Sequence, residues 1–166
     1  MNFEITKQIL EKLEPYVDII NLDIETSVFD WRGQKYKSDF VLLNQEHNVG
    51  FQVYEREVVV FCFGEHQHFN NYTEDETDLD YIAWAIEFLE NLFTLPTKRI
   101  QKYKGKELVS EKYSFIKNGK EDCFSGLISH RLLFYNPFAK KTYKKTILRY
   151  DVDAKTFVNE PLLEDN

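Results

Sequence analysis

The stretch DLDYIAWAIEFLENLFT, residues 78–94, decides the fold of this chain more than any other segment. At 100° per residue, nine apolar side chains fall within an arc of about 180°. The polar side chains form a narrow stripe of Asp80, Glu87, Asn91 and Thr94. Thr77 or Asp78 can cap the start, and Pro96 ends the segment. The spacing predicts an amphipathic helix that packs one face against a sheet.

The residues before this segment predict a second helix and four strands. Apolar side chains from Phe3 to Leu13 recur at helical spacing, and Pro15 follows them. Residues 23–43 are rich in β-branched and aromatic side chains around a turn near Gly33. Two shorter strands are expected over residues 50–54 and 58–63, the second of them a continuous apolar run typical of a central strand.

The residues after Pro96 read as a β-meander. Strands are expected over residues 98–104, 107–115, 127–135 and 141–150, and Asn118-Gly119 is a strong signal for a two-residue hairpin turn. The whole pattern predicts one α+β domain over residues 1–166. We expect a twisted antiparallel sheet of about six to eight strands, with the long helix packed on it and the N-terminal helix beside it.

Charge is sorted along the chain. Residues 1–95 carry 6 Lys and Arg against 19 Asp and Glu, a net of −13, whereas residues 96–166 carry 15 against 9, a net of +6. Charge sorted in this way predicts one acidic and one basic surface on the folded molecule. An acidic surface steers a basic partner toward it.

Composition argues against several classes of protein. No apolar run approaches the ~18 residues of a membrane span, and the first residues lack the pattern of a secretion signal, so we expect a cytoplasmic protein. Cys62 and Cys123 lack metal-site spacing and are expected to be buried thiols. The common nucleophile-elbow, phosphate-loop, dinucleotide and zinc-protease motifs are absent from the sequence, so we expect no enzyme activity and no cofactor.

The segment FCFGEHQHF, residues 61–69, is the one compact group of residues whose side chains are suited to catalysis or metal binding. If a single strand runs through it, a period of two places Cys62, His66 and His68 on one face. Two histidines at this spacing can present two metal ligands. Three interpretations stay open: a metal site in a small metal-dependent enzyme, a polar strand end, and a partner-binding surface.

Basic and aromatic residues alternate over residues 98–149, from Lys98 and Tyr103 to Tyr143 and Arg149. Such a pattern could bind nucleic acid, because lysines neutralise phosphates and rings stack on bases. The competing interpretation is that lysine is common on solvent-facing and edge positions of strands, where it discourages edge-to-edge aggregation. The net charge of −7 also argues against a nucleic-acid partner. A ligand-binding or nucleic-acid-binding module therefore remains an alternative function.

Residues 50–93 combine a strand pair, the segment FGEHQHF, an acidic loop and an amphipathic helix. This layout resembles that of small cytoplasmic immunity proteins that neutralise bacterial polymorphic or contact-dependent toxins. The resemblance covers about a quarter of the chain. It implies a protein that binds its cognate toxin domain stoichiometrically and blocks the active site or the approach of substrate.

We expect the partner to contact one acidic patch with an aromatic anchor. Trp84 lies close to the polar stripe of the helix, where it either packs under a loop or anchors a partner. The alternative is that the acidic run, Glu74 to Asp80, only stabilises the N-terminus of the helix that it precedes. The expected partner-binding residues are Glu74, Asp75, Glu76, Asp78, Asp80, Trp84, His66 and His68.

Overall fold

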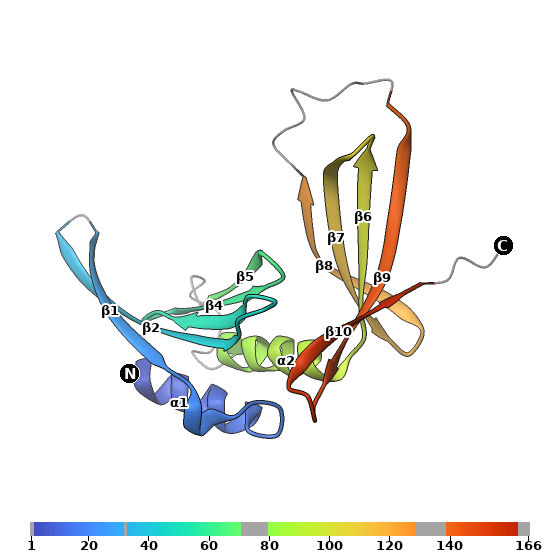
Figure 1. The fold of residues 1–166 in the computed structure, drawn as a ribbon. Coiled ribbons are helices and arrows are strands. Elements are labelled where there is room, and N and C mark those ends of the chain that lie inside the picture. The colour runs from blue at the N-terminus through green and yellow to red at the C-terminus, as the bar shows by residue number, and fades with distance from the viewer. Residues whose placement is uncertain (1, 32, 71–79, 129–138, 163–166) are drawn as a thin grey trace. The chain divides into compact units, whose positions relative to one another are not determined.

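A computed structural model describes residues 2–31, 33–70, 80–128 and 139–162 of the chain (Figure 1). Contacts divide the chain into two compact units, Met1–Asn91 with Val152–Thr156 (unit 1) and Leu92–Asp151 with Phe157–Asn166 (unit 2). The structure confirms an α+β fold with antiparallel strands. The prediction of one sheet of six to eight strands is wrong, because the described strands form two sheets of five strands each.

Unit 1 contains a sheet in which the strands pair in the order in which they occur along the chain, β1-β2-β3-β4-β5, all antiparallel. Short turns connect them, and short turns favour pairing between consecutive strands. The elements are α1 (Asn2–Leu13), a 3₁₀ turn η1 (Ile19–Asn21), β1 (Ile24–Trp31), β2 (Gln34–Asn44), β3 (Val49–Val53), β4 (Glu57–Cys62), β5 (Glu65–Asn70) and α2 (Asp80–Thr94), whose last three residues belong to unit 2.

Strand β5 was not predicted, and the condition that a single strand runs through residues 61–69 is not met. Phe63 and Gly64 have φ angles of 55° and 87°, and Cys62 pairs with Glu65 across them. Two consecutive positive φ angles are typical of a two-residue hairpin turn. A phenylalanine rarely adopts a positive φ, which is why the pattern did not predict this turn.

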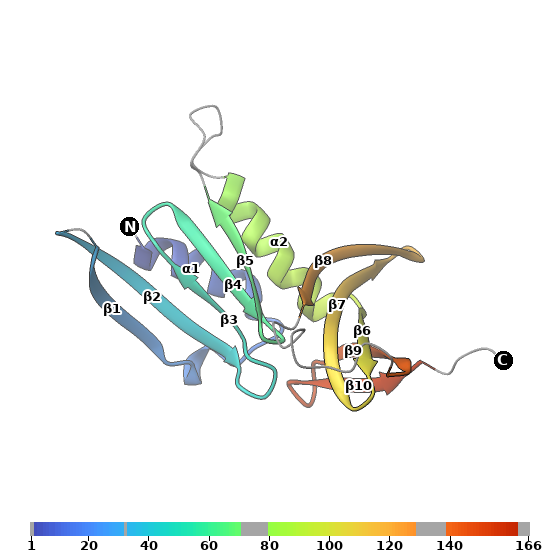
Figure 2. The ribbon, with the colours of Figure 1, turned by 90° about the horizontal axis from the view of Figure 1, so that it is seen from above.

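The two helices cover the same face of the sheet of unit 1 (Figures 1 and 2). The Thr6 hydroxyl of α1 donates a hydrogen bond of 3.1 Å to Asp39 of β2. The Phe88 ring of α2 lies 5.6 Å from the Phe69 ring of β5. The predicted helices are confirmed, and the apolar arc of α2 is buried as expected, at Tyr81, Ile82, Ala85, Ile86, Leu89, Leu92 and Phe93.

Unit 2 contains a second antiparallel sheet with the strand order β10-β9-β6-β7-β8, so that β6, its first strand along the chain, is central. The predicted turn at Asn118-Gly119 is confirmed by φ angles of 53° and 74°. The next strand, β8, starts directly after it at Lys120 and is described as far as Ile128; residues 129–135 of the predicted strand lie outside the described residues. The strand β10 was not predicted. The elements are β6 (Thr97–Lys104), β7 (Glu107–Lys117), β8 (Lys120–Ile128), β9 (Lys141–Asp151) and β10 (Thr156–Pro161).

Ring packing closes one end of unit 2. Phe93, near the end of α2, lies 4.7 Å from the ring of Tyr150 and 6.1 Å from the ring of Phe157.

Within the described residues, neither helix combines the length and the apolar composition that a membrane span requires.

The packing of α2 is tested by replacing Leu89, which is fully buried, with alanine. We expect Leu89→Ala to lower the free energy of unfolding by about 2–5 kcal/mol, because the truncated side chain leaves a cavity in the core. The control replaces Ala83, which is exposed on the same helix, with glutamine. Ala83→Gln should change the free energy of unfolding by less than about 0.5 kcal/mol. Urea unfolding of both variants measures the difference, and equal effects would contradict the helix packing described above.

Candidate functional site

One face of the sheet of unit 1 is covered by neither helix. Side chains alternate along a strand, and Phe69 points toward α2, so its neighbour His68 lies on the other face. The cross-strand register extends this face over β2, β3, β4 and β5 in two rows. The first row is Phe40, Gln52, Val59 and His68, and the second is Leu42, Gly50, Phe61 and His66. We call these residues, together with Glu57, the open face.

Aromatic side chains form the middle of the open face. The rings of Phe40 and Phe61 lie 5.9 Å apart and are half-buried, and Val59 of the same face is buried. The amide of Gln52 donates a hydrogen bond of 2.9 Å to the hydroxyl of the buried Ser38. The centre of the face is therefore apolar and fixed in position by its neighbours.

The two histidines lie together at the β5 edge of the open face. Their ring centroids are 5.0 Å apart at an angle of 75°. Nδ1 of His68 lies 2.7 Å from Oε1 of Glu57, whose side chain is 17% exposed against 49% for His68. A hydrogen bond to a carboxylate fixes the orientation of an imidazole. The pair thus presents one oriented ring and one exposed ring at the rim of an apolar patch.

The predicted face of Cys62 is wrong. The two histidines do lie on one face, but Val58, Val60 and Cys62 point to the opposite side of β4, among buried core side chains. The turn at Phe63 and Gly64 is the reason, because it makes Cys62 the cross-strand partner of Glu65. Across an antiparallel pair, opposed residues share a face, so the histidines lie with Val59 and Phe61 instead.

Within the described ranges, no group of three or more His, Cys, Asp or Glu side chains is arranged to hold a metal ion. His66, His68 and Glu57 therefore do not form a metal centre by themselves. A zinc-type site needs at least three protein ligands.

The predicted acidic patch is only partly described. Glu74, Asp75, Glu76 and Asp78 lie outside the described residues, and Asp80 is the first residue of α2. Trp84 is 46% exposed, as its place near the polar stripe predicts. It belongs to the helical layer, whereas His66 and His68 lie on the opposite face of the sheet. A single patch joining them would have to extend around the β5 edge.

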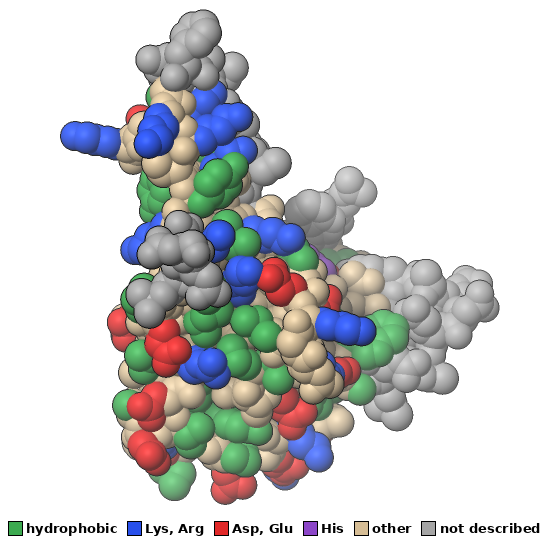
Figure 3. All heavy atoms as spheres, turned by 90° about the vertical axis from the view of Figure 1, so that its right-hand side faces the viewer, with side chains coloured by type: hydrophobic (Ala, Val, Ile, Leu, Met, Phe, Trp, Pro, Cys, Tyr) green, Lys and Arg blue, Asp and Glu red, His purple; other side chains and the backbone are tan. Residues whose placement is uncertain are grey.

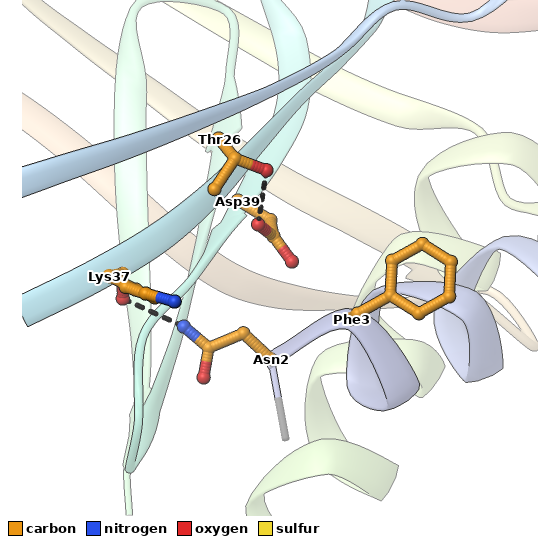
Figure 4. Close-up of a pocket in the computed structure, with 5 residues that line it drawn as sticks. All are labelled: Asn2, Phe3, Thr26, Lys37 and Asp39. Carbon is orange, nitrogen blue, oxygen red and sulfur yellow. Dashed lines mark hydrogen bonds between the residues drawn. The ribbon is translucent and has the colours of Figure 1, made fainter.

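A small open pocket of about 290 Å³ lies at the start of α1, lined by Asn2, Phe3, Thr26, Lys37 and Asp39 (Figure 4). Asp39 is buried, and its carboxylate accepts hydrogen bonds from Thr26 at 2.8 Å and from Thr6 at 3.1 Å. The Asn2 amide donates to the Lys37 carbonyl at 2.7 Å. These bonds attach α1 to β1 and β2, which gives the pocket a structural role that no sequence motif indicated.

Unit 2 carries a strongly basic sheet face on its three interior strands. Along β9, β6 and β7 the register aligns Lys104 with Lys141, Lys102 with Tyr143, and Ile100 with both Lys145 and Lys112. Figure 3 shows Lys and Arg side chains gathered where the upper ends of these strands lie in Figure 1. We call this the basic face; its cationic residues are Lys98, Lys102, Lys104, Lys112, Lys141, Lys145 and Arg149.

Many of these lysines occupy solvent-facing positions, as expected, but few of them lie on the two edge strands. The interior strands β6, β7 and β9 carry ten Lys and Arg residues, whereas the edge strands β8 and β10 carry only Lys120. Charge that discourages edge pairing belongs on the outer strands.

The two compact units carry net charges of opposite sign. Unit 1 has 7 Lys and Arg against 20 Asp and Glu, a net of −13. Unit 2 has 14 against 8, a net of +6.

Searches among protein families, curated proteins and solved structures found nothing that matches this chain. The resemblance to immunity proteins therefore stays a prediction.

The two cysteines differ in environment. Cys62 is buried as expected, and burial, with a smaller contribution from Glu65, raises the pKa of its thiol to about 12. The prediction that Cys123 is buried is wrong, since it is exposed on the edge strand β8.

Alkylation tests this difference in thiol chemistry. Because the thiolate is the reactive form, the raised pKa keeps Cys62 protonated and unreactive as pH rises toward about 12, and its burial shields it from the reagent, whereas Cys123 is exposed to it. We expect iodoacetamide at about pH 8.5 to label Cys123 alone in the folded protein and both cysteines in urea. Peptide mass spectrometry measures the labelling. Rapid labelling of Cys62 in the folded chain would contradict its burial.

Proposed function

We propose that this chain is a non-enzymatic binding protein that neutralises a cognate toxin domain in the cytoplasm, with its acidic unit 1 as the contact region. The observation that supports the proposal is that the two compact units carry opposite net charges, −13 on unit 1 and +6 on unit 2. The resemblance of residues 50–93 to immunity proteins supplies the type of partner.

The charge of unit 1 favours a basic partner. A net charge of this size on one compact unit attracts an oppositely charged protein and raises its rate of association. The positive unit 2 repels the same partner. The two units thus favour one orientation of approach, in which the partner meets unit 1.

The open face supplies a contact surface within unit 1. Stable interfaces combine an apolar, often aromatic centre with a polar rim. Phe40 and Phe61 form such a centre, and His66, His68 and Glu57 form part of its rim. Trp84 on α2 offers a second anchor, on the other side of the β5 edge.

Survival of cells that express the toxin tests the function as a whole. The toxin domain is taken from the gene directly upstream of this one, and the two proteins are expressed together. The proposal predicts survival of the cells and a stoichiometric complex of the two purified proteins. Death of the cells despite abundant folded protein would overturn it.

The acidic run is tested by neutralising Glu74, Asp75 and Glu76 together. We expect slower association with the toxin domain and a weaker dependence of its rate on salt, because rim charges act on steering. The control neutralises Glu4, Glu14 and Asp18, which removes the same charge elsewhere in unit 1. Stopped-flow fluorescence measures both rates. Equal effects would show that only net charge matters, and a lower melting temperature with unchanged kinetics would assign the run to helix stability.

The two candidate aromatic anchors, Phe61 and Trp84, lie on opposite sides of the sheet. They are tested by Phe61→Ala and Trp84→Ala. We expect Phe61→Ala to accelerate dissociation at a cost of about 2 kcal/mol or more, since truncating a central aromatic anchor costs this much. Trp84→Ala should have this effect only if the partner extends around the β5 edge. Surface plasmon resonance measures the dissociation rates, and melting curves verify that both variants fold. An unchanged dissociation rate in Phe61→Ala would exclude the open face.

A further inference from the structure

We propose that the basic face of unit 2 binds single-stranded nucleic acid, with Tyr143 as a stacking platform for a base. This inference goes beyond the proposed function, because it concerns unit 2 and a different class of ligand.

Lysines flank Tyr143 both along its own strand, β9, and on the neighbouring strand β6. Lys141 and Lys145 are two residues before and after it on β9 and therefore share its face. Lys102 of β6 is its direct cross-strand partner. Tyr143 is 55% exposed. An exposed ring flanked by lysines is the arrangement with which proteins stack bases while neutralising the adjacent phosphates.

Lys102 and Lys141 beside Tyr143, together with Lys112, are the cations of the basic face with charge available for a ligand. At the other end of the basic face, Lys98 lies 2.6 Å from Glu121 and Arg149 lies 3.3 Å from Glu160, so protein carboxylates partly neutralise both. Among the described residues, Lys102, Lys112 and Lys141 form no ion pair. Positive charge is thus concentrated at the end of the face where the ring is exposed.

The net charge of −7 does not exclude a nucleic-acid partner. That value combines −13 on unit 1 with +6 on unit 2. Charges separated by more than about 10 Å are largely screened at 0.1 M salt, so the local charge of the basic face governs binding.

An acidic protein surface, including unit 1 of a second copy, is the competing occupant. Charge complementarity would serve it equally well. The exposed aromatic ring at the centre of the cations favours nucleic acid, because every base presents a face for stacking.

The test uses fluorescein-labelled oligothymidylate and oligouridylate of about 15 nucleotides, a length within the usual site size. Fluorescence anisotropy at low salt measures binding to the full chain. We expect Tyr143→Ala to weaken binding by roughly 5- to 150-fold. Neutralising Lys102, Lys112 and Lys141 to Gln together should weaken it and reduce the salt slope by about 2.

The matched control neutralises Lys144, Lys120 and Lys35, which lie off the basic face. Lys144 is the sharpest of these, since it stands between Tyr143 and Lys145 on β9 but points to the opposite side of the sheet. The proposal predicts a much smaller loss for the control triple, with unchanged circular dichroism for all variants.

Three results would overturn the proposal. The first is no binding of either oligonucleotide at low salt, and the second is an equal loss in the control triple. The third is competition by polyglutamate as effective as that of unlabelled oligonucleotide, together with unchanged binding in Tyr143→Ala, which would assign the face to an acidic protein. None of these measurements involves the toxin, so a failure here leaves the proposed function of unit 1 unaffected.

Discussion

Short antiparallel connections are the constraint on which the rest of this structure depends. Because a tight turn can join only neighbouring strands, β1 to β5 pair in chain order and close one sheet before the chain reaches β6. Contacts therefore stay largely within each half of the sequence. Charge that is sorted along the chain is consequently sorted between compact units, and this gives the two sheets their opposite chemical character.

Much of the secondary structure could be predicted, but its assembly could not. The apolar arc around Leu89 predicts a helix with one buried face, and Asn118-Gly119 predicts a hairpin turn; both are confirmed. Periodicity shows which face of a strand is buried but does not show which strands share a sheet. The strand order of the second sheet depends on β9 pairing with β6, a contact between distant residues that no local pattern indicates.

The candidate surfaces show the same limit. The spacing of His66 and His68 predicts that their rings share a face, yet the positive φ of Phe63 places that face away from Cys62. The lysines of residues 98–149 were visible in the sequence. That most of them lie on β6, β7 and β9 became clear only from the strand order, so edge protection does not account for most of them.

The most direct test of the account is the association rate of the unmodified chain with the toxin domain, measured by stopped flow between about 0.01 M and 1 M salt. If the acidic unit 1 steers the encounter, the association rate should fall steeply with added salt while the dissociation rate changes little. An association rate that is independent of salt, or that rises with it, would contradict the central claim.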